Sequence, residues 1–246
     1  MNRKILGEQI HGHLQLYRDL GVRYVSRPAP SAQNRKPKTK NPESPPAETV
    51  IAAGETVVTA GETLEAILAD IGNCRRCKLA PTRTNLVFGS GNPRASLMFV
   101  GEAPGADEDE QGLPFVGRAG RLLTLIVESI GFRREDVYIC NILKCRPPNN
   151  RNPETDEIAA CEGFLFRQIA AVQPGVIVAL GTFGAQTLLK TTETIGKLRG
   201  RLLDYRGVKL IATYHPAYLL RSPLEKRKVW DDMRIAHNYI RALPRQ

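Results

Sequence analysis

The sequence lacks any long apolar run and has few cysteines, five in 246 residues. No stretch approaches the ~20 apolar residues that a membrane-spanning helix needs, and none resembles a secretory signal peptide. We therefore expect a cytoplasmic protein without a membrane partner. In a reducing compartment five cysteines do not form a disulfide framework, so their spacing needs another explanation. The chain has no internal repeats either.

Acidic residues are in the minority, because 35 Lys and Arg face 25 Asp and Glu and give a net charge of +10. A basic surface raises the local concentration of polyanions such as nucleic acid. The positive excess is shared between the N-terminal part and the rest of the chain. Charge alone does not identify the partner.

The N-terminal quarter differs from the rest. Leu6, Ile10 and Leu14 belong to an apolar stripe at helical spacing, so residues 1–25 are predicted to contain an amphipathic helix. This helix either packs back on its own domain or binds a protein partner. Residues 26–58 are rich in Pro and Lys and predict a disordered linker. Residues 59–246 are predicted to form one folded domain, and we expect a monomer.

Four apolar runs alternate with helical segments in this domain, at residues 97–100, 137–140, 176–180 and 208–213. Such runs are typical of parallel strands that are covered on both faces, which predicts an α/β fold. Each run leads into a polar or glycine residue: Glu102 after Gly101, Asn141, Gly181 and His215. Because ligands bind at the carboxyl ends of parallel strands, Glu102, Asn141 and His215 should converge.

The helical segments follow from their apolar spacing. One helix is expected over residues 62–71, and a long loop over residues 101–117. Asn152 and Pro153 should begin a helix with Cys161 on its buried stripe, and Thr182 should cap the next one. A final helix carries Trp230.

Four of the cysteines suggest a metal cluster. Cys74 and Cys77 form a Cys-x-x-Cys pair, while Cys145 follows the second predicted strand and Cys161 lies on a helix. Structural zinc sites usually come from two closely spaced pairs, so this wide spacing favours four thiolates on a 4Fe-4S cluster. Taken alone, Cys161 also fits an apolar core position. Cys140 lies inside a strand and is predicted to be core.

Five motifs follow one another along the chain. They are Gly101-Glu102-Ala103-Pro104-Gly105, Asp107-Glu108-Asp109, Gly112-Leu113-Pro114-Phe115-Val116-Gly117, Asn141-Ile142-Leu143-Lys144-Cys145-Arg146-Pro147-Pro148 and His215-Pro216-Ala217-Tyr218-Leu219-Leu220-Arg221. In this order they resemble the motifs of the family-four uracil-DNA glycosylases. The resemblance runs from about Cys74 to Tyr239 and includes the four cysteine positions of that family's 4Fe-4S cluster. It implies a three-layer α/β/α sandwich around a central four-stranded, mainly parallel sheet, and removal of uracil from DNA.

The chemistry of uracil removal suits these residues. The enzyme must flip the nucleotide out of the stack and read its Watson–Crick edge. The Asn141 amide pairs with uracil O4 and N3–H but is mismatched to cytosine. Phe115 offers a flat face to the ring, and the main chain around Ala103 and Pro104 can approach it. His215 can donate a hydrogen bond to uracil O2 as negative charge develops there.

Two acids are candidates for orienting the attacking water, Glu102 and Glu108. We expect Glu108 to hold the water and Glu102 to shape the pocket. Leu219, Leu220 and Arg221 are predicted to enter the gap left by the flipped base. No lysine stands in a Schiff-base position, so we expect a monofunctional enzyme that leaves an abasic site.

Two alternatives remain open on the sequence alone. The first is an iron-sulfur DNA-binding protein without glycosylase activity, because fold does not fix function. The second is a glycosylase with a broader range of deaminated bases.

Overall fold

The computed structural model of the protein describes residues 61–243. The predicted N-terminal helix (1–25) and the linker (26–58) lie outside the described residues. Within them, no helix is both long and apolar enough to cross a membrane.

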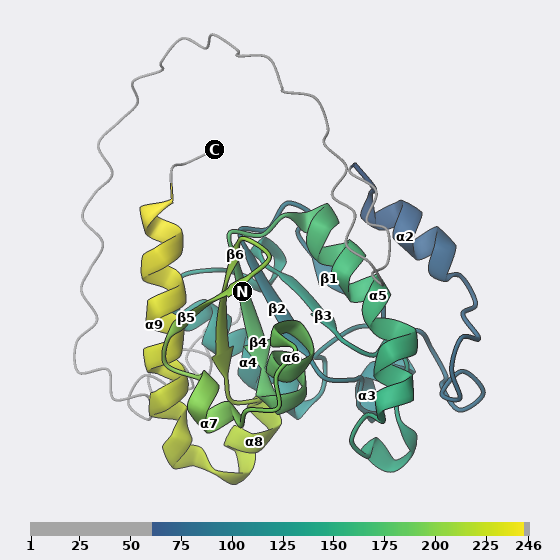
Figure 1. Cartoon of the computed structure of the whole chain (residues 1–246). Helices are drawn as coiled ribbons and strands as arrows, with labels where there is room; N and C mark the ends of the chain where they lie inside the picture. Colours follow the sequence, from purple (N-terminus) through teal and green to yellow (C-terminus); the bar gives the residue numbers. More distant parts are fainter. Residues whose placement is uncertain (1–60, 244–246) are drawn as a thin grey trace, which may run out of the picture.

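A mixed sheet of six strands forms the centre of the described domain, in the order β1-β3-β2-β4-β6-β5 (Figure 1). Its four inner strands are parallel, namely β3 (Tyr138–Asn141), β2 (Leu97–Gly101), β4 (Val176–Leu180) and β6 (Val208–Thr213). These four coincide with the predicted apolar runs.

The expectation of four strands missed two short edge strands, β1 (Ser90–Gly91) and β5 (Leu202–Tyr205). Both are antiparallel to their neighbours. Neither carries a buried apolar run, since β1 has only two residues and the first three of β5 are not buried. Edge strands are half solvated, so a search for continuous apolar runs does not find them.

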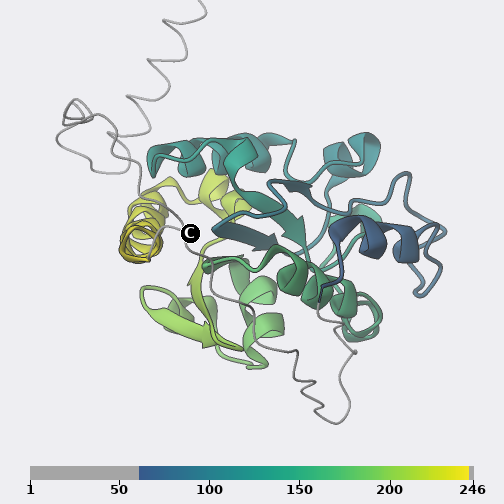
Figure 2. The same ribbon diagram turned by 90° about the horizontal axis from the view of Figure 1, so that it is seen from above.

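Helices cover both faces of the sheet, which confirms the three-layer α/β/α arrangement (Figure 2). Along β2, Met98 and Val100 face a core built with α2 (Leu64–Ile71), α5 (Thr155–Val172) and α6 (Gly181–Leu189). Leu97 and Phe99 face the second core, built with α4 (Arg118–Ser129), α8 (Pro216–Arg221) and α9 (Lys226–Ala242). Both faces of each central strand are thus buried.

Three local expectations about helices were wrong. Residues 101–117 contain a short helix, α3 (Ala106–Gln111). Helix α5 begins two residues later than the Asn-Pro signal suggested, because the Glu157 carboxylate accepts a hydrogen bond from the Glu154 N–H and makes Glu154 the N-cap. Helix α6 begins at Gly181 directly after β4, so Thr182 lies inside it. The shorter elements are α7 (Ile195–Leu198) and the 3-10 turns η1 (Arg134–Asp136), η2 (Pro148–Asn150) and η3 (Pro223–Glu225).

Candidate active site

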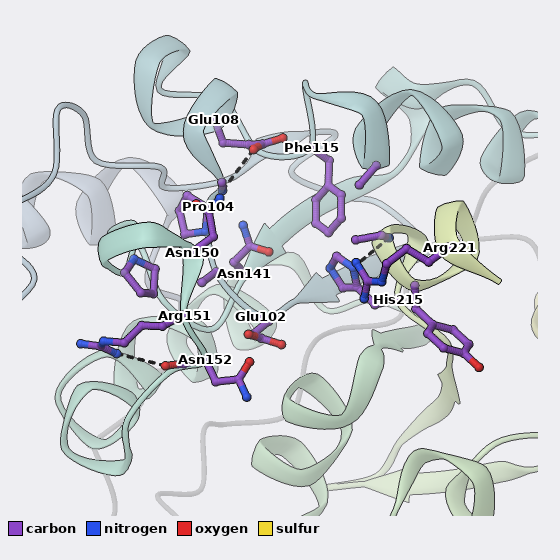
Figure 3. Close-up of a pocket in the computed structure, with 16 residues that line it drawn as sticks. Glu102, Pro104, Glu108, Phe115, Asn141, Asn150, Arg151, Asn152, His215 and Arg221 are labelled. Carbon is purple, nitrogen blue, oxygen red and sulfur yellow. Dashed lines mark hydrogen bonds between the residues drawn. The ribbon is translucent and has the colours of Figure 1, made fainter.

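A cavity of about 430 Å³ lies at the carboxyl ends of β2, β3 and β6. Glu102, Asn141 and His215 all line it, so the predicted convergence of these three side chains is found (Figure 3). Phe115 and Pro104 complete the inner wall. A cavity of this size is within the range of small-ligand sites.

Asn141 is the most informative side chain of this cavity. It is the last residue of β3 and is 1% exposed. Neither atom of its amide, Nδ2 or Oδ1, has a hydrogen-bond partner among residues 61–243. Leaving a buried polar group unpaired costs about 1–3 kcal/mol per group. A buried amide with both atoms free therefore indicates a ligand with one acceptor and one donor side by side.

Gly101 makes room for this amide. A Cβ at this position would lie 2.3 Å from Asn141 Oδ1 and 2.6 Å from Phe115 Cζ. Both are well inside contact distance, so any side chain here would displace the amide and the ring. The strand β2 must end in glycine for the two groups to sit side by side.

Phe115 belongs both to the pocket and to the core. Its backbone φ is +53°, in the left-handed region, and its side chain is 6% exposed. The ring lies 5.6 Å from the His215 ring, tilted by 33°. Gly120 of α4 lets the helix approach the Phe115 carbonyl, because a Cβ there would lie 1.9 Å from that oxygen. The unusual backbone is thus held by close packing.

His215 is the N-cap of α8, and its Nδ1 accepts a hydrogen bond from the Ala217 N–H at 3.1 Å. Burial, with a smaller effect of Arg221, lowers the His215 pKa to about 4. The ring is therefore neutral near pH 7. With Nδ1 as acceptor, its proton lies on Nε2, and that nitrogen is free to act as a donor.

Glu102 follows β2 and is half-buried. Burial raises its pKa to about 7, and none of the described residues pairs with the carboxylate. A carboxyl with a pKa near the operating pH suits a general base. Glu102 also lines a second cavity of about 390 Å³, together with Tyr214, Tyr218 and Phe183.

Glu108 also lines the main cavity, but its carboxylate is occupied. Oε1 accepts hydrogen bonds from the N–H groups of Val116 and Gly117 at 2.9 Å, and Oε2 accepts one from Gly105 at 3.1 Å. These contacts fix the loop that carries Phe115. Asp109, the next residue of α3, is buried and accepts hydrogen bonds from the Thr84 and Asn85 N–H groups.

The three residues predicted to enter the gap left by the flipped base differ in their exposure. Leu219 is 0% exposed and packs in the core with α4, whereas Leu220 is 39% exposed and Arg221 lines the cavity. Sequence reasoning missed Leu224, which is 93% exposed on the turn η3 just after α8. The Ser222-Pro223 pair before it was the available signal, since proline fixes a turn.

Sequence reasoning also missed one wall of the cavity, formed by Pro147, Asn150, Arg151 and Asn152. This loop lies between Cys145 and Cys161 in the chain. Arg151 holds it in place through two hydrogen bonds to the buried Glu157 carboxylate, at 2.9 and 2.5 Å. The Asn-rich loop gave no apolar or charge pattern that would have indicated this role.

The four predicted cluster cysteines come from three parts of the fold: the segment after α2, the loop after β3, and α5. Burial raises the Cys145 pKa, Arg83 lowers it through a hydrogen bond to Sγ at 3.2 Å, and the nearby Cys77 and Cys74 thiols raise it. Burial raises the Cys161 pKa to about 11, with smaller contributions that include the Cys145 and Cys77 thiols. Cys145 is thus electrostatically coupled to Cys74 and Cys77, and Cys161 to Cys145 and Cys77.

The donor chemistry at these sulfurs fits a thiolate-bound cluster. The Lys144 N–H donates to Cys161 Sγ at 3.3 Å, as Arg83 does to Cys145. Within residues 61–243 no three His, Cys, Asp or Glu side chains meet closely enough to hold a single ion. In a 4Fe-4S cluster each thiolate binds a separate iron, so the four thiolates need not converge on one ion. Cys140 is buried in the core, as predicted.

This fold and this site define a member of the uracil DNA glycosylase superfamily, whose family model matches residues 88–234, more than half of the chain. A type-4 uracil-DNA glycosylase of Archaeoglobus fulgidus is 48% identical over 70% of this chain and 90% of its own length. One of Thermotoga maritima is 46% identical over 72% and 95%. A type-5 enzyme of Pyrobaculum aerophilum is 33% identical over 52% and 64%. The chain belongs to the type-4 group, in agreement with the resemblance of its motifs.

Proposed function

We infer that the protein is a uracil-DNA glycosylase of base excision repair, which hydrolyses the bond between uracil and deoxyribose and leaves an abasic site. The observation that carries this inference is the buried Asn141 amide, whose donor and acceptor are both unpaired within the described chain. Uracil presents the matching pair, the O4 acceptor and the N3–H donor. The protein's partner is therefore DNA that contains uracil.

The flipped base would lie between Phe115 and the main chain of Ala103 and Pro104, with its Watson–Crick edge toward Asn141. All four residues line the cavity. Cytosine offers a donor at position 4 and an acceptor at N3, so the same amide in the same orientation would meet like groups. Uracil is thus preferred.

We propose Glu102, in place of Glu108, as the base that activates water. The Glu108 oxygens already accept three backbone N–H groups, whereas the Glu102 carboxylate is unpaired within the described residues. The water oxygen bonds to C1′ of the sugar while the C1′–N1 bond breaks. The electron pair leaves with uracil, and the water proton passes to Glu102. His215 Nε2–H stabilises the charge at uracil O2.

Among residues 61–243, no lysine lines the cavity. A Schiff base with the sugar therefore has no nucleophile there. This supports a monofunctional reaction without strand cleavage.

We propose that Leu224, together with Leu220 and Arg221, enters the gap left by the flipped base. Leu219 is enclosed by the core and does not reach DNA. Leu224→Ala is expected to lower kcat/KM on duplex DNA about 10-fold, because a buried leucine contributes ~1.5–3 kcal/mol. Activity on single strands should change less than about 2-fold, since no stacked partner must be replaced.

A matched control for this prediction is Leu68→Ala. Leu68 is also exposed, at 47%, but lies on α2 on the far face of the sheet. Kinetics on duplex and single-stranded substrates of the same sequence provide the readout. Equal losses for both substrates would contradict the insertion of Leu224 into the gap left by the flipped base.

We propose that Cys74, Cys77, Cys145 and Cys161 hold a 4Fe-4S cluster. When bound, the cluster would tie the segment after α2 to both ends of the cavity wall formed by residues 147–152. Purified protein should be brown, absorb near ~400 nm and contain about four irons per chain. Cys145→Ser should lose most of the iron, whereas Cys140→Ala, at the buried core cysteine, should keep it. Zinc in stoichiometric amount, with colourless protein, would contradict the cluster.

A further inference from the structure

Lys144 is a buried lysine that the proposed mechanism does not use. It is 0% exposed. Its Nζ donates hydrogen bonds to the Asn141 carbonyl oxygen at 2.7 Å and to Gln168 Oε1 at 2.5 Å. It does not line the cavity. A side chain with this burial is uncommon for lysine and needs a specific reason.

Gln168 of α5 is the second hydrogen-bond acceptor of Lys144 Nζ. It is also 0% exposed, and its Nε2 donates to the Phe88 carbonyl at 3.0 Å and to the Tyr138 hydroxyl at 3.1 Å. Both donor hydrogens of the amide are thus used, which leaves Oε1 oriented toward Lys144. Tyr138 begins β3, the strand that Asn141 ends. Lys144 is therefore held by a residue of α5 that is itself hydrogen-bonded to the first residue of β3.

The main chain between Asn141 and Lys144 is fixed along its length. The Ile142 N–H donates to the Gly101 carbonyl and the Leu143 N–H to the Glu102 carbonyl, both at 3.0 Å. The Lys144 N–H donates to Cys161 Sγ, and its carbonyl accepts from the Val87 N–H at 2.8 Å. The main chain of residues 142–144 is thus hydrogen-bonded to the carbonyls of Gly101 and Glu102 and to Cys161, a predicted cluster ligand.

We propose that Lys144 is a positioning residue for base recognition: its Nζ pins the Asn141 peptide, so that the unpaired amide points at the Watson–Crick edge of the flipped base. The amide itself has no hydrogen-bond partner among the described residues to orient it. Its direction therefore depends on the backbone that carries it. This inference rests on the proposed role of Asn141 in reading uracil.

A double-mutant cycle tests the inference. Lys144→Met keeps the length of the side chain and removes its donors. It is expected to lower kcat/KM for uracil release about 10- to 100-fold, the effect of leaving a buried hydrogen-bond acceptor unpaired. In an Asn141→Ala background the same change should cost less than about 3-fold, because no amide remains to be positioned. Lys190→Met, at an exposed lysine of α6's C-cap, is the matched control.

Iron content and thermal midpoint of each variant show whether it is folded and loaded. If Lys144→Met fails to fold, Gln168→Met provides the same cycle, since it removes the second acceptor of Nζ, and the same non-additivity is expected at smaller amplitude. Equal losses in both backgrounds, or no loss in the wild-type background, would overturn the inference. An Asn141→Ala variant with full activity would instead remove the proposed role of Asn141, so the two failures are distinguishable.

Discussion

Glu102→Gln should lower kcat for uracil release by about 10²- to 10⁴-fold, the usual contribution of a general base. The amide keeps the shape of the side chain but cannot take a proton from water. Wild-type kcat/KM should rise with pH and level off above about pH 7, because burial raises the Glu102 pKa to about 7 and only the ionised form is active. His215, with a pKa of about 4, is already neutral over this range and adds no second step.

Glu108→Gln is the matched control for this prediction. It weakens the acceptor of the Val116, Gly117 and Gly105 N–H groups, so we expect a lower thermal midpoint and a moderate loss of activity. Its pH profile should keep the step near pH 7. The step should disappear in Glu102→Gln. If instead Glu108→Gln loses the step and Glu102→Gln keeps it, the water is held by Glu108.

Asn141→Asp is expected to lower uracil release by about 10³-fold or more, because a site built to bond a polar edge rejects a mismatched one strongly. The change replaces the Nδ2 donor opposite uracil O4 with an acceptor. Discrimination against cytosine should fall with it, since the carboxylate no longer matches uracil better than cytosine. The measurement is single-turnover release from oligonucleotides that differ only in the target base.

Asn152→Asp offers the same chemical change at the rim of the same cavity, where the side chain is exposed. We expect an effect of only a few-fold there, from repulsion of the DNA phosphates. If the two variants behaved alike, a general charge effect would explain both and Asn141 would not read the base.

The sequence predicted which strand ends form this site, and there is a physical reason for that. Buried parallel strands need continuous apolar runs, and their carboxyl ends share one edge, so Glu102, Asn141 and His215 could be brought together without coordinates. The two edge strands could not be found this way, because they are partly solvated and short.

Roles that depend on partners were harder to predict. Glu108 looks like a catalytic acid in the sequence, and only the structure shows three backbone N–H groups on its carboxylate. Leu219 and Leu220 are adjacent and identical in type, yet α8 buries the first and exposes the second. The function of Lys144 depends on Gln168, which lies 24 positions away. Residue type and spacing do not contain such information.

A crystal structure of the protein with uracil bound would test the account most directly. We expect the base stacked on Phe115, with O4 and N3–H paired to the Asn141 amide and O2 within hydrogen-bond distance of His215 Nε2. Uracil bound elsewhere, or in this cavity with the Asn141 amide paired to protein atoms instead, would contradict the assignment of this pocket to base recognition.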